Sequence, residues 1–126
     1  MNVKKLTPLM FVEEIESCLD FWLALGFEKT AEVPEGEKLG FVILKKNDVE
    51  IMYQTRASVA HDIPALADSP QRGSFIYFDV DDIDAFEKSL PASSFVVPRR
   101  KTFYGAHELI VRESAGNVVV FAQFGD

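Results

Sequence analysis

The chain has 126 residues, of which 48% are hydrophobic, which is enough to bury the core of one compact domain. Asp and Glu number 20 against 13 Lys and Arg, and the net charge of −7 opposes binding to nucleic-acid phosphates or an anionic membrane surface. No apolar run is long enough to span a bilayer, no signal peptide is expected, and a single cysteine, Cys18, cannot form an internal disulfide. We therefore expect a cytoplasmic protein with no nucleic-acid and no membrane partner.

The first half of the chain predicts the element order β-α-β-β-β. Residues 6–12 form an apolar run of strand length, and a helical period follows it and ends at Gly26. The apolar stripe of this helix consists of Ile15, Cys18, Leu19, Trp22 and Leu25. Three further strands are expected at residues 27–33, 39–45 and 49–54.

The second half predicts the same order after a connector. Residues 55–72 contain two prolines and a possible short helix through Val59, Ile63 and Leu66, so we interpret them as the connector. The elements expected after it are a strand at 74–80, a helix at 82–90, and strands at 95–101, 106–112 and 117–124.

An internal repeat relates the two halves. The acidic and apolar pattern that starts at Val12 returns 68 residues later at Val80, and Phe27 and Phe95 have the same separation. Each unit is too small to bury a good core alone, so we predict a single domain over residues 1–126. Its parts are one unit at about 4–54, a connector at 55–72 and a second unit at about 73–124. The predicted fold class is α+β, with two tandem β-α-β-β-β units forming a curled mixed sheet around a cleft and the helices outside.

Three motifs give the chain a family resemblance. The run FWLALGF at residues 21–27, Tyr104-Gly105 with Glu108, and the turn at residues 111–117 occur in the order found in the vicinal oxygen chelate superfamily. The chain resembles this family of glyoxalases, extradiol dioxygenases and bleomycin resistance proteins over nearly its whole length. Glu113 and Ser114 stand in the turn where the family usually has Asp and Pro.

The resemblance also implies where a catalytic metal would be held. The family's metal enzymes take four ligands, which correspond by position to Thr7, Glu50, Phe75 and Val120. Only Glu50 has a side chain of the expected type, and a divalent ion needs several convergent His or carboxylate ligands. We therefore expect no metal, no other cofactor and no catalytic residue, and we lean towards a protein that is not an enzyme.

Other residues with reactive side chains give weaker indications. His61 falls in the connector, where a solvated loop residue is expected. Cys18 lies on the helical stripe, where a small core residue is expected. His107 and Glu108 are adjacent on a strand, so their side chains point to opposite faces. The basic run that begins at Arg99 is expected to be a solvated strand end.

Strand alternation predicts which residues share the concave face. The expected lining is apolar and aromatic, with a few polar anchors, as is typical of a small-molecule pocket. The predicted ligand-binding residues are Phe11, Glu50, Met52, Gln54, Phe75, Tyr77 and Asp79, with Tyr104 closing the mouth. The alternative is that these side chains fill the groove as core.

These observations favour a metal-free binding protein similar to the bleomycin resistance branch. It would sequester a small aromatic or cationic molecule in an apolar cleft, as in antibiotic resistance, and the resemblance implies a homodimer with clefts at or near the subunit contact. One alternative is a metal-dependent lyase, isomerase or dioxygenase of the same superfamily, with Glu50 and His107 as its likeliest ligands. Another is a dimeric scaffold with a filled groove.

Overall fold

A computed structural model of the chain describes residues 1–2, 5–68, 75–102 and 104–125. The chain divides into two compact units, Met1–Gln71 and Arg72–Asp126, and each is described by itself. Each unit has one mixed four-stranded sheet, which confirms the predicted α+β class and the two β-α-β-β-β units. None of the helices in the described part of the chain has the length and apolarity that a bilayer crossing requires.

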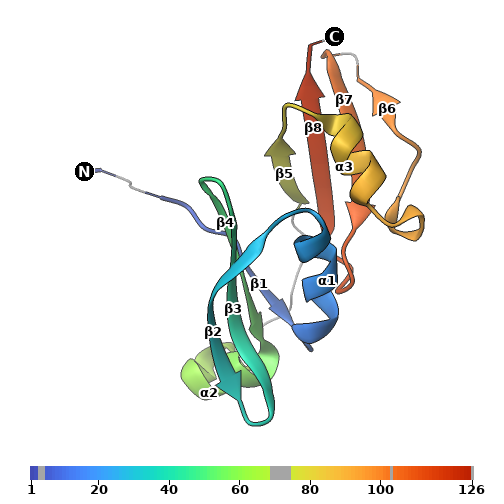
Figure 1. Cartoon of the computed structure of the whole chain (residues 1–126). Coiled ribbons are helices and arrows are strands. Elements are labelled where there is room, and N and C mark those ends of the chain that lie inside the picture. Colours follow the sequence, from blue (N-terminus) through green and yellow to red (C-terminus); the bar gives the residue numbers. More distant parts are fainter. Residues whose placement is uncertain (3–4, 69–74, 103, 126) are drawn as a thin grey trace. The chain divides into compact units, whose positions relative to one another are not determined.

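The N-terminal unit is built on a sheet with the strand order β1-β4-β3-β2 (Figure 1). Strand β1 is parallel to β4, whereas the other neighbours are antiparallel. Its elements are β1 (Leu9–Val12), α1 (Glu16–Ala24), β2 (Glu28–Glu35), β3 (Lys38–Lys46), β4 (Val49–Thr55), α2 (Arg56–Asp62) and the 3-10 helix η1 (Pro64–Leu66).

Helix α1 packs on one face of this sheet through Trp22. This side chain is fully buried, and its Nε1 donates to the Tyr53 hydroxyl on β4 at 2.8 Å. The rings of Phe21 and Phe27 meet Trp22 edge-on, at centroid distances of 5.1 and 4.9 Å. Cys18 is also fully buried, so the prediction that the helical stripe forms the core is confirmed, except that Leu19 is only partly buried.

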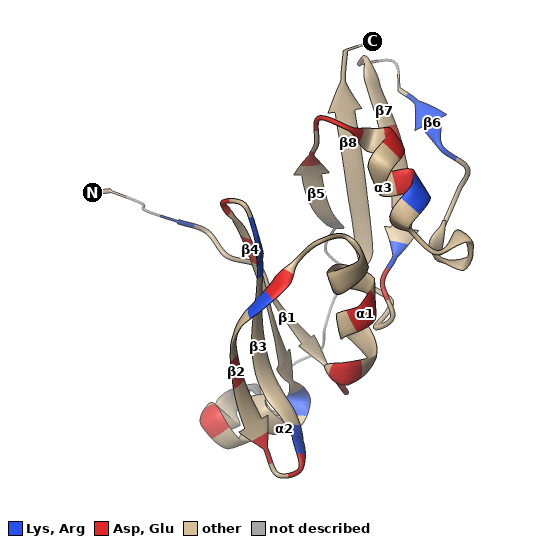
Figure 2. Ribbon diagram, in the orientation of Figure 1, with Lys and Arg blue, Asp and Glu red and all other residues tan. Residues whose placement is uncertain are grey.

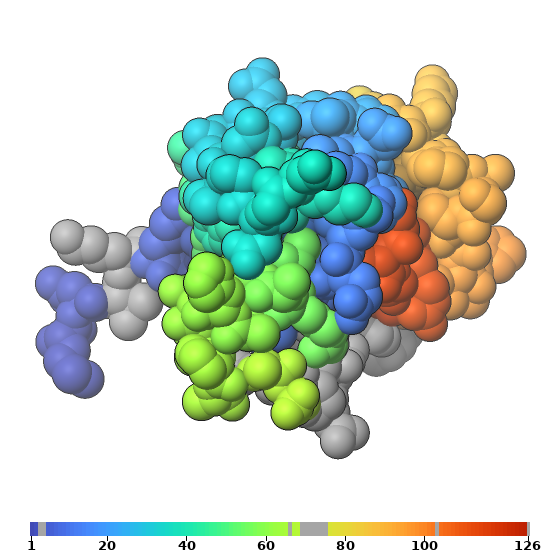
Figure 3. Space-filling model, turned by 90° about the horizontal axis from the view of Figure 1, so that it is seen from below, coloured from blue at the N-terminus to red at the C-terminus, as the bar shows by residue number. Residues whose placement is uncertain are grey.

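Helix α2 (Arg56–Asp62) lies in the segment interpreted as the connector, for which a short helix through Val59 had been considered. Thr55 begins α2 by accepting a hydrogen bond from the Ser58 amide at 3.1 Å, and Val59 is buried. Figure 3 shows α2 beside the β2–β3 hairpin, where His61 Nδ1 lies 3.3 Å from Glu35 Oε1. His61 is therefore in the last turn of a helix and not in a loop as expected.

The C-terminal unit repeats the arrangement with the strand order β5-β8-β7-β6. Strand β5 is parallel to β8, and the remaining pairs are antiparallel. Its elements are β5 (Phe75–Asp79), α3 (Ile83–Ser89), the 3-10 helix η2 (Ala92–Ser94), β6 (Arg100–Lys101), β7 (Ala106–Arg112) and β8 (Val118–Phe124).

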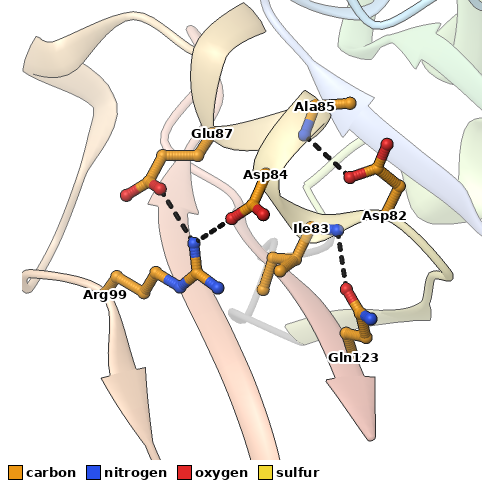
Figure 4. A network of polar contacts seen from close by, with 7 residues as sticks. All are labelled: Asp82, Ile83, Asp84, Ala85, Glu87, Arg99 and Gln123. Carbon is orange, nitrogen blue, oxygen red and sulfur yellow. Dashed lines mark hydrogen bonds and ion pairs between the residues drawn. The ribbon is translucent and has the colours of Figure 1, made fainter. Parts of the chain in front are cut away.

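Helix α3 is held on this sheet at its start and along its exposed side (Figure 4). The Ile83 amide donates to Gln123 Oε1 on β8 at 2.9 Å, and Asp82 caps the helix. Arg99 reaches back to two helix carboxylates, Asp84 at 2.6 Å and Glu87 at 3.0 Å. The expectation of a solvated basic run is therefore wrong for Arg99, whose side chain is only 28% exposed.

The first strand after α3 is much shorter than predicted. Residues 95–101 were expected to be one strand, but β6 covers only Arg100–Lys101, and Phe95 makes an isolated bridge to Val111. Pro98 interrupts the segment, because proline has no amide hydrogen for a sheet ladder. The turn between β7 and β8 is ordered by Glu113, which is buried and accepts a hydrogen bond from the Asn117 amide at 2.7 Å.

The repeat seen in the sequence has a structural equivalent in both units. Ile15 and Ile83 stand 68 positions apart at the beginning of α1 and α3, and both are buried. Acidic side chains surround each of these isoleucines in the sequence because the start of a helix favours negative charge. The repeated segment is thus the point at which each helix begins and is anchored to its own sheet.

Candidate functional site

Each sheet has one face that carries its helix and an opposite face. In the N-terminal unit, Ile51, Tyr53 and Thr55 of β4 are buried, whereas Met52 and Gln54 between them are partly exposed. Phe11 of β1 lies opposite Gln54, so it is on the same face as Met52 and Gln54. The common face predicted for these side chains is observed, and it is the one opposite α1.

Glu50 lies on this face beside a cation. Lys5 Nζ is 2.9 Å from Glu50 Oε1, and the Thr7 hydroxyl is 3.5 Å from the same oxygen. The hydrogen bond from Lys5 holds the pKa of the Glu50 carboxyl below its ordinary value. Further along the strand, the Gln54 amide donates to the Ser58 hydroxyl of α2 at 3.0 Å.

The C-terminal sheet carries a row of polar side chains on the face opposite α3. The strand register places Asp79 on β5 opposite Ala122 on β8, which in turn lies opposite Glu108 on β7. Arg100 on β6 is opposite Glu108 and completes the row. In Figure 2, β6 is the basic edge of this sheet. Three of the four strands therefore contribute a polar residue to a line across the sheet, in which Ala122 of β8 stands between Asp79 and Glu108.

Glu108 is the centre of this row and is almost completely buried, with an exposed fraction of 1%. Its Oε2 accepts from the Tyr77 hydroxyl at 2.9 Å and from the Tyr104 hydroxyl at 2.6 Å. Its Oε1 accepts from Arg100 Nε at 2.9 Å and Nη2 at 2.7 Å. We name Tyr77, Arg100, Tyr104 and Glu108 the Glu108 cluster. Charge-assisted and forked hydrogen bonds of this kind are stronger than neutral ones and fix geometry.

The electrostatics of the Glu108 cluster favour one charge state. Burial alone raises the pKa of the Glu108 carboxyl, but hydrogen bonds from Tyr104, Arg100 and Tyr77 outweigh it, so that this pKa lies below its ordinary value. Partial burial, together with the hydrogen bond to Glu108, raises the pKa of the Tyr77 hydroxyl. At neutral pH the cluster therefore contains the Glu108 carboxylate, the Arg100 guanidinium and the protonated phenol of Tyr77.

The predicted site residues are thus divided between the two sheets. Tyr77 and Tyr104 belong to the Glu108 cluster, and each is 48% exposed. Asp79 is exposed on the same face. Phe75 is the first residue of β5, but its side chain lies outside the described residues.

Sequence reasoning missed the importance of Glu108 and Arg100. Glu108 was recognised in a motif with Tyr104 and correctly placed on the face opposite His107. Arg100 was expected to be solvated, but its guanidinium pairs with the Glu108 carboxylate. The available signal was the combination of a carboxylate on a buried strand with a nearby basic pair, because a buried charge needs a partner.

The residues at the implied metal positions do not fit a divalent cation. Thr7 and Glu50 lie beside each other as the resemblance implies, but the Glu50 carboxylate already forms an ion pair with the Lys5 ammonium. Val120 offers no donor atom, and a repelling cation beside the single carboxylate opposes metal binding. Within residues 5–68, 75–102 and 104–125, no three His, Cys, Asp or Glu side chains come together as a possible metal centre.

Two hollows of the N-terminal unit lie away from the predicted residues. One, of about 170 Å³, is at the acidic start of α1 (Figure 2), where Glu14 pairs with Lys38 at 2.8 Å and Glu16 accepts from the Leu39 amide at 2.7 Å. The other, of about 390 Å³, lies beside Gly26 and Lys46. The Lys46 ammonium donates there to the Leu25 carbonyl at 2.7 Å. The first hollow is strongly acidic, because five glutamates and a single lysine line it, and Glu16 Oε1 is buried there with no hydrogen-bond partner among the described residues.

The sequence matches the model of one known protein family. The family model described as Glyoxalase/Bleomycin resistance protein/Dioxygenase superfamily matches residues 6–121. A search of curated proteins finds no match.

Solved structures show the same fold. A glyoxalase/bleomycin resistance protein/dioxygenase family enzyme from Burkholderia phytofirmans PsJN is 16% identical with a TM-score of 0.75, covering 94% of this chain and 97% of that one. TioX from Micromonospora sp. ML1 is 14% identical with a TM-score of 0.74, covering 98% and 100%. The bleomycin-binding protein from Streptomyces verticillus, solved with copper(II)-bleomycin, is 22% identical with a TM-score of 0.63, covering 100% and 99%. At these identities the likeness establishes the fold alone.

Proposed function

Because the chain belongs to the glyoxalase/bleomycin resistance protein/dioxygenase superfamily, we propose that it is a binding protein that holds a small aromatic or cationic molecule without a catalytic metal. Members of this superfamily bind small molecules, often as dimers. A fold hosts many functions, so the proposal depends on the side chains of the two sheet faces.

The observation that carries the proposal is the exposure of two fixed aromatic rings on the Glu108 cluster. Tyr77 and Tyr104 are each about half exposed, yet their hydroxyls are held by one buried carboxylate. Rings fixed in this way lose little conformational entropy when a ligand packs on them, which is the advantage of preorganisation. The ring of Phe124 lies 6.4 Å from that of Tyr104 and extends the aromatic surface.

The N-terminal sheet face supports the same proposal. Phe11 and Met52 are partly exposed apolar side chains, and Gln54 and Glu50 supply polar groups beside them. A largely apolar lining with few polar anchors is typical of small-molecule sites. The bleomycin-binding protein from Streptomyces verticillus is a similar structure that was solved in complex with copper(II)-bleomycin, and a neighbour of this kind supports a binding function.

Titration of the purified chain with arylalkyl probes tests the proposal. We expect at least one of 2-phenylethylammonium, 3-phenylpropanoate and 3-phenylpropanol to bind, and Tyr104→Ala to weaken that binding about tenfold, because it removes an aromatic contact surface. Leu23→Ala removes an exposed side chain from α1 and should leave the affinity unchanged. Absence of binding by all three probes, or equal affinity of Tyr104→Ala and the wild type, would contradict the proposal.

Elemental analysis of the same preparation separates this proposal from a metal-assisted lyase, isomerase or dioxygenase. We expect no stoichiometric transition metal, since Lys5 competes for the only suitable carboxylate among the implied ligands. Stoichiometric Zn, Ni, Mn or Fe in protein purified without chelator would favour the enzymatic alternative. We also propose that the chain forms a homodimer, as the family resemblance implies. Sedimentation equilibrium, which should give the mass of two chains, tests this.

A further inference from the structure

We infer that Glu108 sets the hydrogen-bond polarity of the Glu108 cluster, so that it selects a ligand with a protonated amine beside an aromatic ring over one with a carboxylate. The inference rests on the proposed function and names the class of molecule bound at the same surface. It assigns Glu108 as a positioning residue, because it acts on the ligand through the tyrosines.

The first argument is the position of the phenolic protons. A carboxylate has no proton to donate, and a hydroxyl has one proton and two lone pairs. Since the Tyr77 and Tyr104 hydroxyls both lie within hydrogen-bond distance of Glu108 Oε2, both protons point at that oxygen. The Tyr77 oxygen can therefore act towards a ligand only as an acceptor, which suits an N–H donor and repels a carboxylate.

The second argument is the charge along the row. The Arg100 guanidinium is forked onto Glu108 Oε1 through two nitrogens, so these two charges oppose each other within the cluster. Asp79 follows Tyr77 by two residues on the same face and is exposed. The row Asp79, Glu108 and Arg100 therefore carries a net negative charge at neutral pH. Arg112 shares this face, but it lies at the other end of β7 and donates to the Gly116 carbonyl at 2.9 Å.

The third argument is the aromatic surface beside these acceptors. Tyr104 and Phe124 are both about half exposed, with ring centroids 6.4 Å apart. Aromatic faces attract ammonium groups through their quadrupole and also stack with a ligand ring. Acceptor oxygens, an exposed carboxylate and aromatic faces on one side of a sheet together match an arylalkyl ammonium ion.

Space for the tyrosine depends on a small residue. Tyr77 lies opposite Val120, and its hydroxyl must reach Glu108, two strands away in the sheet order β5-β8-β7. The β8 residue directly between Asp79 and Glu108 is Ala122, whose methyl group leaves this path open. The contact between Tyr77 and Glu108 is thus built from the register of three strands, whereas Tyr104 reaches Glu108 from the turn between β6 and β7.

A matched pair of probes tests the inference by isothermal titration at about pH 7, where both probes are charged. The probes are 2-phenylethylammonium and 3-phenylpropanoate, which share a phenyl ring and differ in the sign of the charge. We expect the wild type to bind the ammonium at least about tenfold more tightly, as is typical of a hydrogen bond to a charged group. Tyr77→Phe removes the acceptor and should reduce this ratio several-fold.

Glu108→Gln provides the sharper variant. The glutamine amide can donate hydrogen bonds to the phenol oxygens, so that the phenolic O–H groups can turn towards the ligand and donate to it. The ratio of the affinities for the ammonium and the carboxylate probe should therefore move in favour of the carboxylate. Glu87→Gln removes one negative charge from the same unit outside the cluster and should keep the wild-type ratio. If Glu108→Gln does not fold, Tyr77→Phe decides, because it leaves the Arg100–Glu108 pair in place.

The outcomes distinguish the inference from the proposed function. Equal or tighter binding of 3-phenylpropanoate by the wild type overturns the inference and leaves the proposed function standing. An unchanged ratio in Tyr77→Phe and in a folded Glu108→Gln also overturns it. Failure of every arylalkyl probe to bind overturns both.

Discussion

Trp22→Ala is expected to lower the free energy of unfolding of the N-terminal unit by about 3–5 kcal/mol, the usual cost of truncating a buried tryptophan. The side chain is fully buried, donates to Tyr53 at 2.8 Å and meets the rings of Phe21 and Phe27. Its removal leaves a cavity between α1 and the sheet and takes the hydrogen-bond donor from a buried tyrosine. Urea unfolding followed by far-UV circular dichroism measures the change.

Leu23→Ala is the matched control for this substitution. Leu23 is the next residue of the same helix and is 44% exposed, so its truncation should change the stability by no more than about 0.5 kcal/mol. Similar losses for both variants would show that the helix is not anchored through the buried indole.

Glu108→Gln is expected to destabilise the C-terminal unit by about 2 kcal/mol at pH 7, a value typical of hydrogen bonds to a charged group. The carboxylate is 1% exposed and receives hydrogen bonds from Tyr77, Tyr104 and Arg100. The three partners are about half exposed and can regain water, which keeps the loss well below that of a fully buried ion pair.

The difference between wild type and Glu108→Gln should also depend on pH in a defined direction. The pKa of Glu108 is lowered in the folded state, so the folded protein releases this proton more readily than the unfolded chain. Its contribution is fully present above the unfolded pKa of about 4.3 and is lost as the pH falls through the lower folded pKa. Urea midpoints measured from pH 7 to pH 3 give the trend.

Glu87→Gln is the control for this series. Glu87 also pairs with an arginine, but its side chain is 41% exposed, and exposed pairs contribute no more than about 1 kcal/mol. A constant gap between wild type and Glu108→Gln across the whole pH range would contradict the account, because it would mean that folding leaves the pKa of Glu108 unchanged.

Strand alternation was sufficient to predict much of the fold. The face shared by Phe11, Met52 and Gln54 follows from the two-residue period of a strand, and the structure has it. The burial of Trp22 and Cys18 follows in the same way from the helical period. The shortened β6 could have been expected as well, since Pro98 stands within the predicted segment.

The partners of Glu108 could not be predicted by these rules. Alternation tells which face of a strand a residue occupies, but it does not tell which strand is the neighbour. Tyr77, Arg100 and Glu108 come together because the sheet order is β5-β8-β7-β6, with β8 inserted between β5 and β7. For the same reason the Lys5–Glu50 pair, which depends on how the segment before β1 runs, was not foreseen.

The ring signals of the three tyrosines test most directly whether the Glu108 cluster binds a ligand. In a tyrosine-labelled sample titrated with 2-phenylethylammonium, we expect the NMR ring signals of Tyr77 and Tyr104 to shift with a common saturation curve. Tyr53, which is buried in the other unit against Trp22, is the internal reference and should not shift. Saturable binding that leaves the signals of both Tyr77 and Tyr104 unmoved would contradict the account.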